Sequence, residues 1–81
     1  MGRTSARPIR GQILREARIA KFMSQSDVLR ECAERGLTLD QTHLSKIERG
    51  LIKWPALRTL PVLAEVLGLD VEELFAEEEA A

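Results

Sequence analysis

Apolar side chains recur along the chain at intervals of three and four residues, the spacing that places them on one face of an α-helix. In the first such stretch, residues 10–22, this face holds Ile13, Leu14, Ala17 and Ala20. Stretches with the same period follow at residues 25–35, 41–49, 60–67 and 71–76. No segment keeps up the strict alternation that is typical of a half-buried strand. The pattern predicts an all-α domain of five short helices around one core, with Val28, Leu29, Cys32 and Ala33 as the inward residues of the second helix.

Polar residues mark where three of these helices begin. The second helix starts after Ser24, a good cap, and Asp27 three positions later is the acidic half of a capping box. The third starts after Asp40, and the fifth after Asp70 with Glu73 completing a second box. Glycines stand at the ends of the second, third and fourth helices, where a left-handed residue commonly stops a helix: Gly36, Gly50 and Gly68.

The composition is that of a small globular domain, with 81 residues of which 44% are hydrophobic and 31% charged. Its apolar runs are too short to cross a membrane, and its first residues lack the apolar centre of a signal peptide. We therefore expect a cytoplasmic protein with no membrane partner. The single cysteine, Cys32, and the single histidine allow no internal disulfide and no structural zinc site, so we expect no metal, no cofactor and an ordinary core role for Cys32.

The charge is divided unevenly along the chain. Residues 1–58 hold all 12 Lys and Arg and six of the 13 acids, a net charge of +6, whereas residues 59–81 hold seven acids and no base. This asymmetry is typical of a nucleic-acid-binding domain with an acidic tail, and taken alone it fits a chance surface bias equally well. The chain divides accordingly into a flexible basic arm (1–9), a folded domain (10–75) and an acidic tail (76–81).

Short motifs in a fixed order resemble a known family. Residues 44–50 read Leu-Ser-Lys-Ile-Glu-Arg-Gly, residues 23–25 read Met-Ser-Gln, residues 63–69 read Leu-Ala-Glu-Val-Leu-Gly-Leu, and Leu-Phe follows at 74–75. Over residues 10–75 the sequence resembles the Cro/repressor-type helix-turn-helix family, also called the XRE or lambda-repressor-like family. The resemblance implies a five-helix DNA-binding domain that works as a dimeric transcriptional regulator.

The third helix is the expected reading helix. In a helix-turn-helix, the second helix of the motif lies in the major groove and its side chains meet base edges. Glutamine can pair with adenine, lysine with guanine, and a threonine methyl can touch a thymine methyl. The expected readers are Gln41, Thr42, His43, Ser45 and Lys46. His43 is equally suited to a phosphate, and without the flanking motifs all five read as a solvated helix face.

Other residues have expected roles beside the reading helix. The resemblance implies that Gln25 grips a phosphate at the start of the second helix, where free amides also attract an anion. Arg49 and Lys53 flank the end of the third helix and should contact phosphates. Glu48 would repel phosphate unless it were paired, and Arg18 lies at the position of the family's partner for this glutamate. We expect the two to form a structural pair that orients the reading helix.

Two features depart from the family's pattern. Roughly five extra residues lie between Gln25 and Glu48, so either the second helix is extended or the turn through residues 37–39 exceeds the usual three or four residues. The loop after the third helix is also unusually apolar, and exposed apolar clusters tend to mark interfaces. The expected dimer interface is Leu51, Ile52 and Trp54 with Phe75, and the alternative is that Trp54 covers its own core.

These features predict a sequence-specific DNA-binding regulator, a repressor, that binds a two-fold symmetric operator on double-stranded DNA as a homodimer. An enzyme is not expected, because the sequence offers no nucleophile with a base, no metal cluster and no glycine-rich phosphate loop. The alternative is a protein-interaction module on the same fold, such as an antitoxin or an adaptor, which the acidic tail and the Trp54 loop favour.

Overall fold

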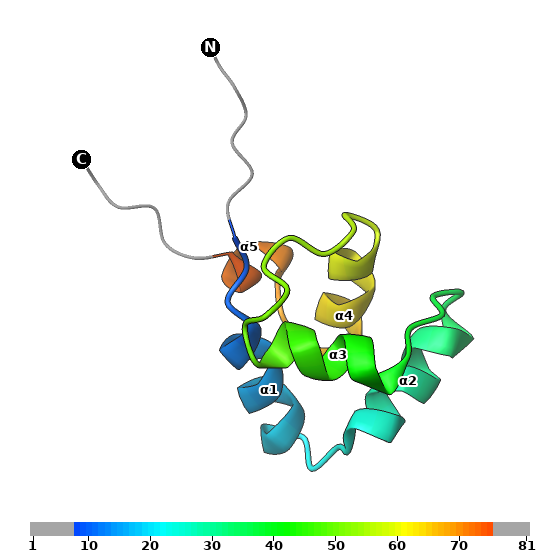
Figure 1. Cartoon of the computed structure of the whole chain (residues 1–81). Helices are drawn as coiled ribbons and strands as arrows, with labels where there is room; N and C mark the ends of the chain where they lie inside the picture. The colour runs from blue at the N-terminus through cyan, green and yellow to red at the C-terminus, as the bar shows by residue number, and fades with distance from the viewer. Residues whose placement is uncertain (1–7, 76–81) are drawn as a thin grey trace, which may run out of the picture.

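The computed structural model describes residues 8–75, so most of the predicted arm and the whole predicted tail lie outside the described residues. The described part consists of five helices without a strand: α1 (Gly11–Ala20), α2 (Gln25–Glu34), α3 (Gln41–Glu48), α4 (Thr59–Leu67) and α5 (Val71–Leu74). This confirms the predicted all-α fold (Figure 1). None of the five helices is long and apolar enough to span a bilayer.

One hydrophobic core joins all five helices. α1 and α4 each pack against three other helices: α1 against α3, α4 and α5, and α4 against α1, α2 and α5; α3 packs against α1 and α2. Val28 and Cys32 are buried as predicted, and burial raises the pKa of the Cys32 thiol, which keeps it neutral. Ala20 and Ala33, predicted to face inward, are exposed because each lies beyond the edge of the buried face of its helix.

Two of the three predicted helix caps form. The Ser24 hydroxyl accepts from the Asp27 amide and the Asp27 carboxylate accepts from the Ser24 amide, a bond that lowers the pKa of Asp27. The Asp40 carboxylate accepts from the His43 amide at 2.7 Å. α5 begins after Asp70 as predicted, but the Asp70 side chain forms no cap hydrogen bond, and the Glu73 amide donates to the backbone carbonyl of Asp70 instead.

The extra length between α2 and α3 lies in their connection. α2 has ten residues and ends at Glu34, so the helix is not extended. Residues 35–40 connect it to Gln41, a longer turn than the three or four residues that are usual. Leu37 is buried within this connection and its amide donates to the Cys32 carbonyl. The packing and the hydrogen bond of Leu37 therefore hold the enlarged turn against the core.

The start of α1 packs directly against the end of α3. Gly11 is buried, and a Cβ on it would overlap the carbonyl oxygen of Ile47, so only glycine permits this approach. Just before it, Ile9 is buried, donates its amide to the carbonyl of Lys53 at 2.9 Å, and pairs with Phe75 in an antiparallel bridge. Ile9 therefore belongs to the packed domain, whereas the sequence assigned it to the arm.

The first four helices end in the same hydrogen-bonded arrangement. At the end of α2, Gly36 donates its amide to the carbonyl of Ala33, and the next amide donates to the carbonyl of Cys32. These are the two bonds of the Schellman motif, which needs a left-handed residue after the C-cap. α3 and α4 repeat them, and the three glycines have φ values of 86°, 83° and 73°. The predicted left-handed stop at Gly36 is confirmed.

α1 ends with the same bonds around a phenylalanine. The amide of Phe22 donates to the carbonyl of Ile19, and the amide of Met23 donates to the carbonyl of Arg18. Phe22 has a φ of 58°. This conformation costs a residue with a Cβ about 1–2 kcal/mol. The Phe22 side chain is 95% exposed, so packing offsets little of that cost. The helix predicted over residues 10–22 therefore ends at Ala20, and Phe22 forms its stop.

We predict that Phe22→Gly raises the free energy of unfolding by about 0.5–1 kcal/mol. Glycine removes the steric cost of the left-handed conformation. It also raises the conformational entropy of the unfolded chain, which offsets a smaller part of this gain in stability. Phe22→Ala is the matched control, because it removes the exposed ring and keeps the Cβ, and it should stay within about 0.5 kcal/mol of the parent. Urea unfolding of the three proteins measures the difference. Equal stabilisation by both variants would contradict a backbone origin.

Candidate nucleic-acid interface

α3 turns one polar face away from the core. Its inward side consists of Leu44, Ile47 and Glu48, all buried. Its outward side carries Gln41, Thr42, Lys46 and the C-cap Arg49, all exposed, and the half-buried Ser45. At about 100° per residue, these five positions share one face. α3 lies across the front of the molecule in Figure 1, with no other described element covering it. The structure thus brings these five predicted contact residues together.

His43 lies apart from this face. It is half-buried and lines a surface groove of about 300 Å³ beside the connection between α2 and α3. Leu39 and Arg58 line the same groove. Of the predicted readers on α3, His43 is the one that the structure does not bring to the outward face, because the helical rotation places it on the flank.

A buried carboxylate anchors α3 to α1. The Arg18 Nε donates to Glu48 Oε2 at 2.8 Å and its Nη2 donates to Glu48 Oε1 at 3.0 Å. The side chains of Arg18 and Glu48 are only 13% and 3% exposed. Arg18 Nη1 also donates to the backbone carbonyl of Met23 at 3.0 Å, which ties in the segment between α1 and α2. Rotation of α3 about its axis would break both bonds of the ion pair.

Gln25 links this ion pair to the outward face of α3. Its Nε2 donates to Glu48 Oε1 at 3.1 Å, and its Oε1 accepts from Gln41 Nε2 at 3.2 Å. A hydrogen-bonded chain therefore runs from Arg18 through Glu48 and Gln25 to Gln41. Gln41 retains its carbonyl oxygen and one N–H, the pair that a bidentate contact to adenine uses. The sequence indicated only a phosphate contact for Gln25 and gave no sign of this chain.

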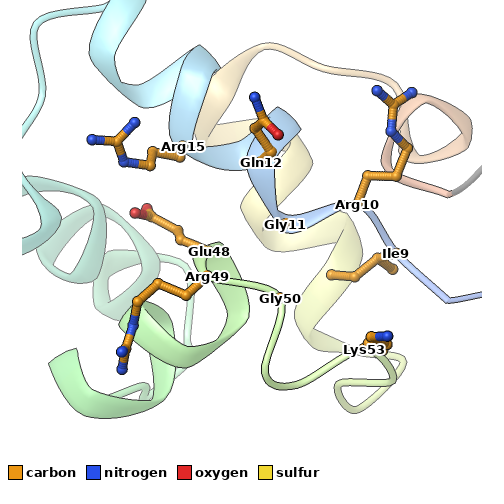
Figure 2. A pocket seen from close by; sticks show the side chains of 9 residues that line it. All are labelled: Ile9, Arg10, Gly11, Gln12, Arg15, Glu48, Arg49, Gly50 and Lys53. Carbon is orange, nitrogen blue, oxygen red and sulfur yellow. The ribbon is translucent and has the colours of Figure 1, made fainter.

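A basic groove lies beside the end of α3. Figure 2 shows Arg10 and Arg15 projecting from the α1 side, and Arg49 and Lys53 from the α3 side, around a groove of about 530 Å³. These four side chains define the basic groove. Arg49 and Lys53 were predicted phosphate contacts, whereas Arg10 and Arg15 were not predicted. The positions of Arg10 and Arg15 beside Arg49 result from the packing of α1 against α3, and sequence spacing does not reveal this packing.

The predicted dimer residues are divided between surface and core. Leu51 and Trp54 are 63% and 61% exposed, so Trp54 is not buried as a cover over its own core. Ile52 and Phe75 are partly buried and pack against the core. Leu57, which was not predicted, is 80% exposed in the same loop. The exposed apolar surface of this region is therefore formed by Leu51, Trp54 and Leu57, which we call the loop patch.

The two adjoining helices α2 and α3, with a polar face turned outward on the second, define a helix-turn-helix protein. A family model described as Helix-turn-helix matches residues 14–74, from α1 to the end of α5. The chain belongs to this family, the Cro/repressor-type (XRE, lambda-repressor-like) family of DNA-binding regulators. The resemblance found in the sequence is thereby confirmed. No curated protein and no solved structure matched the chain.

We predict strong coupling between Arg18 and Glu48 in a double-mutant cycle. Arg18→Met or Glu48→Gln alone should lower the free energy of unfolding by about 3 kcal/mol, because the change breaks a buried charged pair. The double variant should cost clearly less than the two single changes together. The control cycle is Arg30 with Asp27, an exposed pair whose coupling should stay below about 1 kcal/mol. Additive effects at Arg18 and Glu48 in urea unfolding would contradict the prediction.

Proposed function

We propose that this protein is a sequence-specific DNA-binding regulator that reads bases in the major groove with α3 and acts as a repressor. The observation that carries the proposal is the outward face of α3, which is polar, exposed and held in orientation by the buried pair of Arg18 and Glu48. Membership of the helix-turn-helix family supports DNA binding itself. Repression requires only that the bound protein occupies a promoter. We propose that it does so in the cytoplasm and without a catalytic role.

Each outward residue of α3 has a chemistry suited to one part of the duplex. Gln41 offers an acceptor and a donor to adenine, and Lys46 can donate to guanine. The Thr42 methyl group can pack against a thymine methyl group, and the Ser45 hydroxyl can donate or accept. Arg49 lies at the C-terminal end of this face, where the phosphate backbone borders the major groove of DNA. The proposal therefore separates two readers of sequence, Gln41 and Lys46, from a positioning contact, Arg49.

We predict that Lys46→Ala and Gln41→Ala each relax the preference at one or two base positions, by about 1–3 kcal/mol. Arg49→Ala should weaken all duplexes alike and reduce the salt dependence of binding, because a phosphate contact carries no base information. Selection of bound duplexes from a random pool, for the parent and each variant, measures both effects. If the Lys46 and Gln41 variants select the parent's sequence unchanged, α3 is not the reader.

A two-fold symmetric operator and a homodimer complete the proposal. One recognition helix contacts only a few base pairs, and helix-turn-helix dimers gain specificity from two half-sites about 34 Å apart. The loop patch is an exposed apolar surface that follows α3 in the chain. In Figure 1 the loop that carries it runs from the end of α3 toward α4 and does not cross in front of α3. An isologous contact through Leu51, Trp54 and Leu57 would therefore keep both reading helices available.

We predict that Trp54→Ala converts the dimer to a folded monomer with weak operator binding, because exposed tryptophans are frequent hot spots of interfaces. Light scattering measures the mass, circular dichroism the fold, and titration with the selected duplex the affinity. Phe22→Ala is the control, since it removes an aromatic residue that is even more exposed than Trp54 and lies outside the loop patch, and it should leave the dimer intact. A Trp54 variant that remains dimeric would place the interface elsewhere.

The second candidate function is a protein-interaction module, as in an antitoxin or an adaptor, and the loop patch is the observation that favours it. The dependence of binding on salt separates the two functions. A DNA-binding face must lose affinity for mixed duplex DNA steeply as salt rises, whereas a module that binds only protein has no such requirement.

A further inference from the structure

Of the four cations of the basic groove, only Arg49 belongs to the outward face of α3. We propose that the basic groove binds backbone phosphates of one DNA strand outside the base pairs that α3 reads. α1 is then a second DNA-contacting element, and its Arg10 and Arg15 extend the footprint. This inference rests on the proposed function and adds a binding site to it.

Within residues 8–75, the cations of the basic groove have no acidic partner. Among residues 8–75, no carboxylate forms an ion pair with Arg10, Arg15, Arg49 or Lys53. Of the described residues that line the groove, Glu48 is the one acid, and its carboxylate is held by Arg18 and by Gln25. The groove therefore presents an excess of positive charge that an anion of several charges, such as a run of phosphates, can neutralise.

The shape of the groove also suits a phosphate backbone. Gly11 and Gly50 lie in the middle of the view in Figure 2, with the four cationic side chains around them, so no side chain of these two residues fills the centre. The first turn of α1, which includes Gly11, lies beside the groove. This turn has no side-chain cap and no acid, so the positive end of the helix adds to the positive charge of the four cations. A chain of phosphates can lie across an open groove of this kind.

The position of the groove relative to α3 decides which phosphates it meets. An eight-residue helix is about 12 Å long, close to the width of the major groove, so backbones lie within reach of both of its ends. Gln25 stands at the first end, where it bonds to Gln41, and the basic groove lies at the other, beyond Arg49. Arg10 and Arg15 therefore lie beyond the bases read by α3.

The test compares the parent with an Arg10→Gln, Arg15→Gln double variant on the selected duplex. Each phosphate contact contributes about 0.9 to the slope of log affinity against log salt, so the double variant should reduce that slope by about 2. The selected sequence should not change. Lys21→Gln is the matched control: it removes a cation from the other end of α1, where the Lys21 side chain lies beside Gly68, and it should leave the slope unchanged.

A second measurement uses duplexes that keep the selected bases and carry uncharged methylphosphonates in place of the phosphates beyond the bases read by α3, on the side of Arg49. This change should weaken binding by the parent and leave binding by the double variant nearly unchanged. Equal losses for the two proteins, or an unaltered salt slope in the variant, would overturn the groove proposal while DNA reading by α3 stands.

Inorganic phosphate, followed through the amide resonances of Gly11 and Gly50, distinguishes failure of the groove from failure of the proposed function. Phosphate should shift both resonances in the parent and not in the double variant, and absence of any shift in the parent would overturn the groove as an anion site. If phosphate shifts them but the parent binds no duplex, the groove takes another anion, and both the DNA assignment of the groove and the proposed function are overturned.

Discussion

The buried carboxylate of Glu48 is the constraint on which the arrangement of the helices around α3 depends. An uncompensated charge at this depth would cost several kcal/mol, so the fold must bring a cation and further donors to it. Arg18 comes from α1 and Gln25 from α2, and both reach the same carboxylate. Satisfying one charge thus fixes three helices relative to each other. Because a pair of this kind adds little net stability, its main consequence is a defined orientation of α3.

The two ends of α3 are held by different physical means. At its first residue, Gln41 is held by a side-chain amide, which positions a group that can also bind a base. At its last turn, the absence of a side chain on Gly11 lets the backbone of α1 approach the carbonyl of Ile47. That approach also brings Arg10 and Arg15 beside Arg49. Tight packing of two helices and a concentration of positive charge therefore have one origin.

Local signals predicted the helices well, because caps such as Ser24 and stops such as Gly36 act through bonds within a few residues. Features that depend on distant packing were not predictable in the same way. The burial of Ile9 and the positions of Arg10 and Arg15 require the folded arrangement of α1, α3 and α5. The link from Gln25 to Glu48 spans 23 positions, and no sequence period reports it. Family resemblance supplied the pairing of Glu48 that spacing alone could not.

The bridge between Ile9 and Phe75 joins the first and last parts of the described chain. Two strands of backbone that leave a domain side by side can be connected by a short linker with little strain. A circular permutant with that linker, opened at the exposed Thr38 in the enlarged turn, would keep the ion pair, the core and the outward face of α3. The order in which the helices follow along the chain is thus separable from their arrangement in space, and α3 could become the first helix of a protein with the same binding surface.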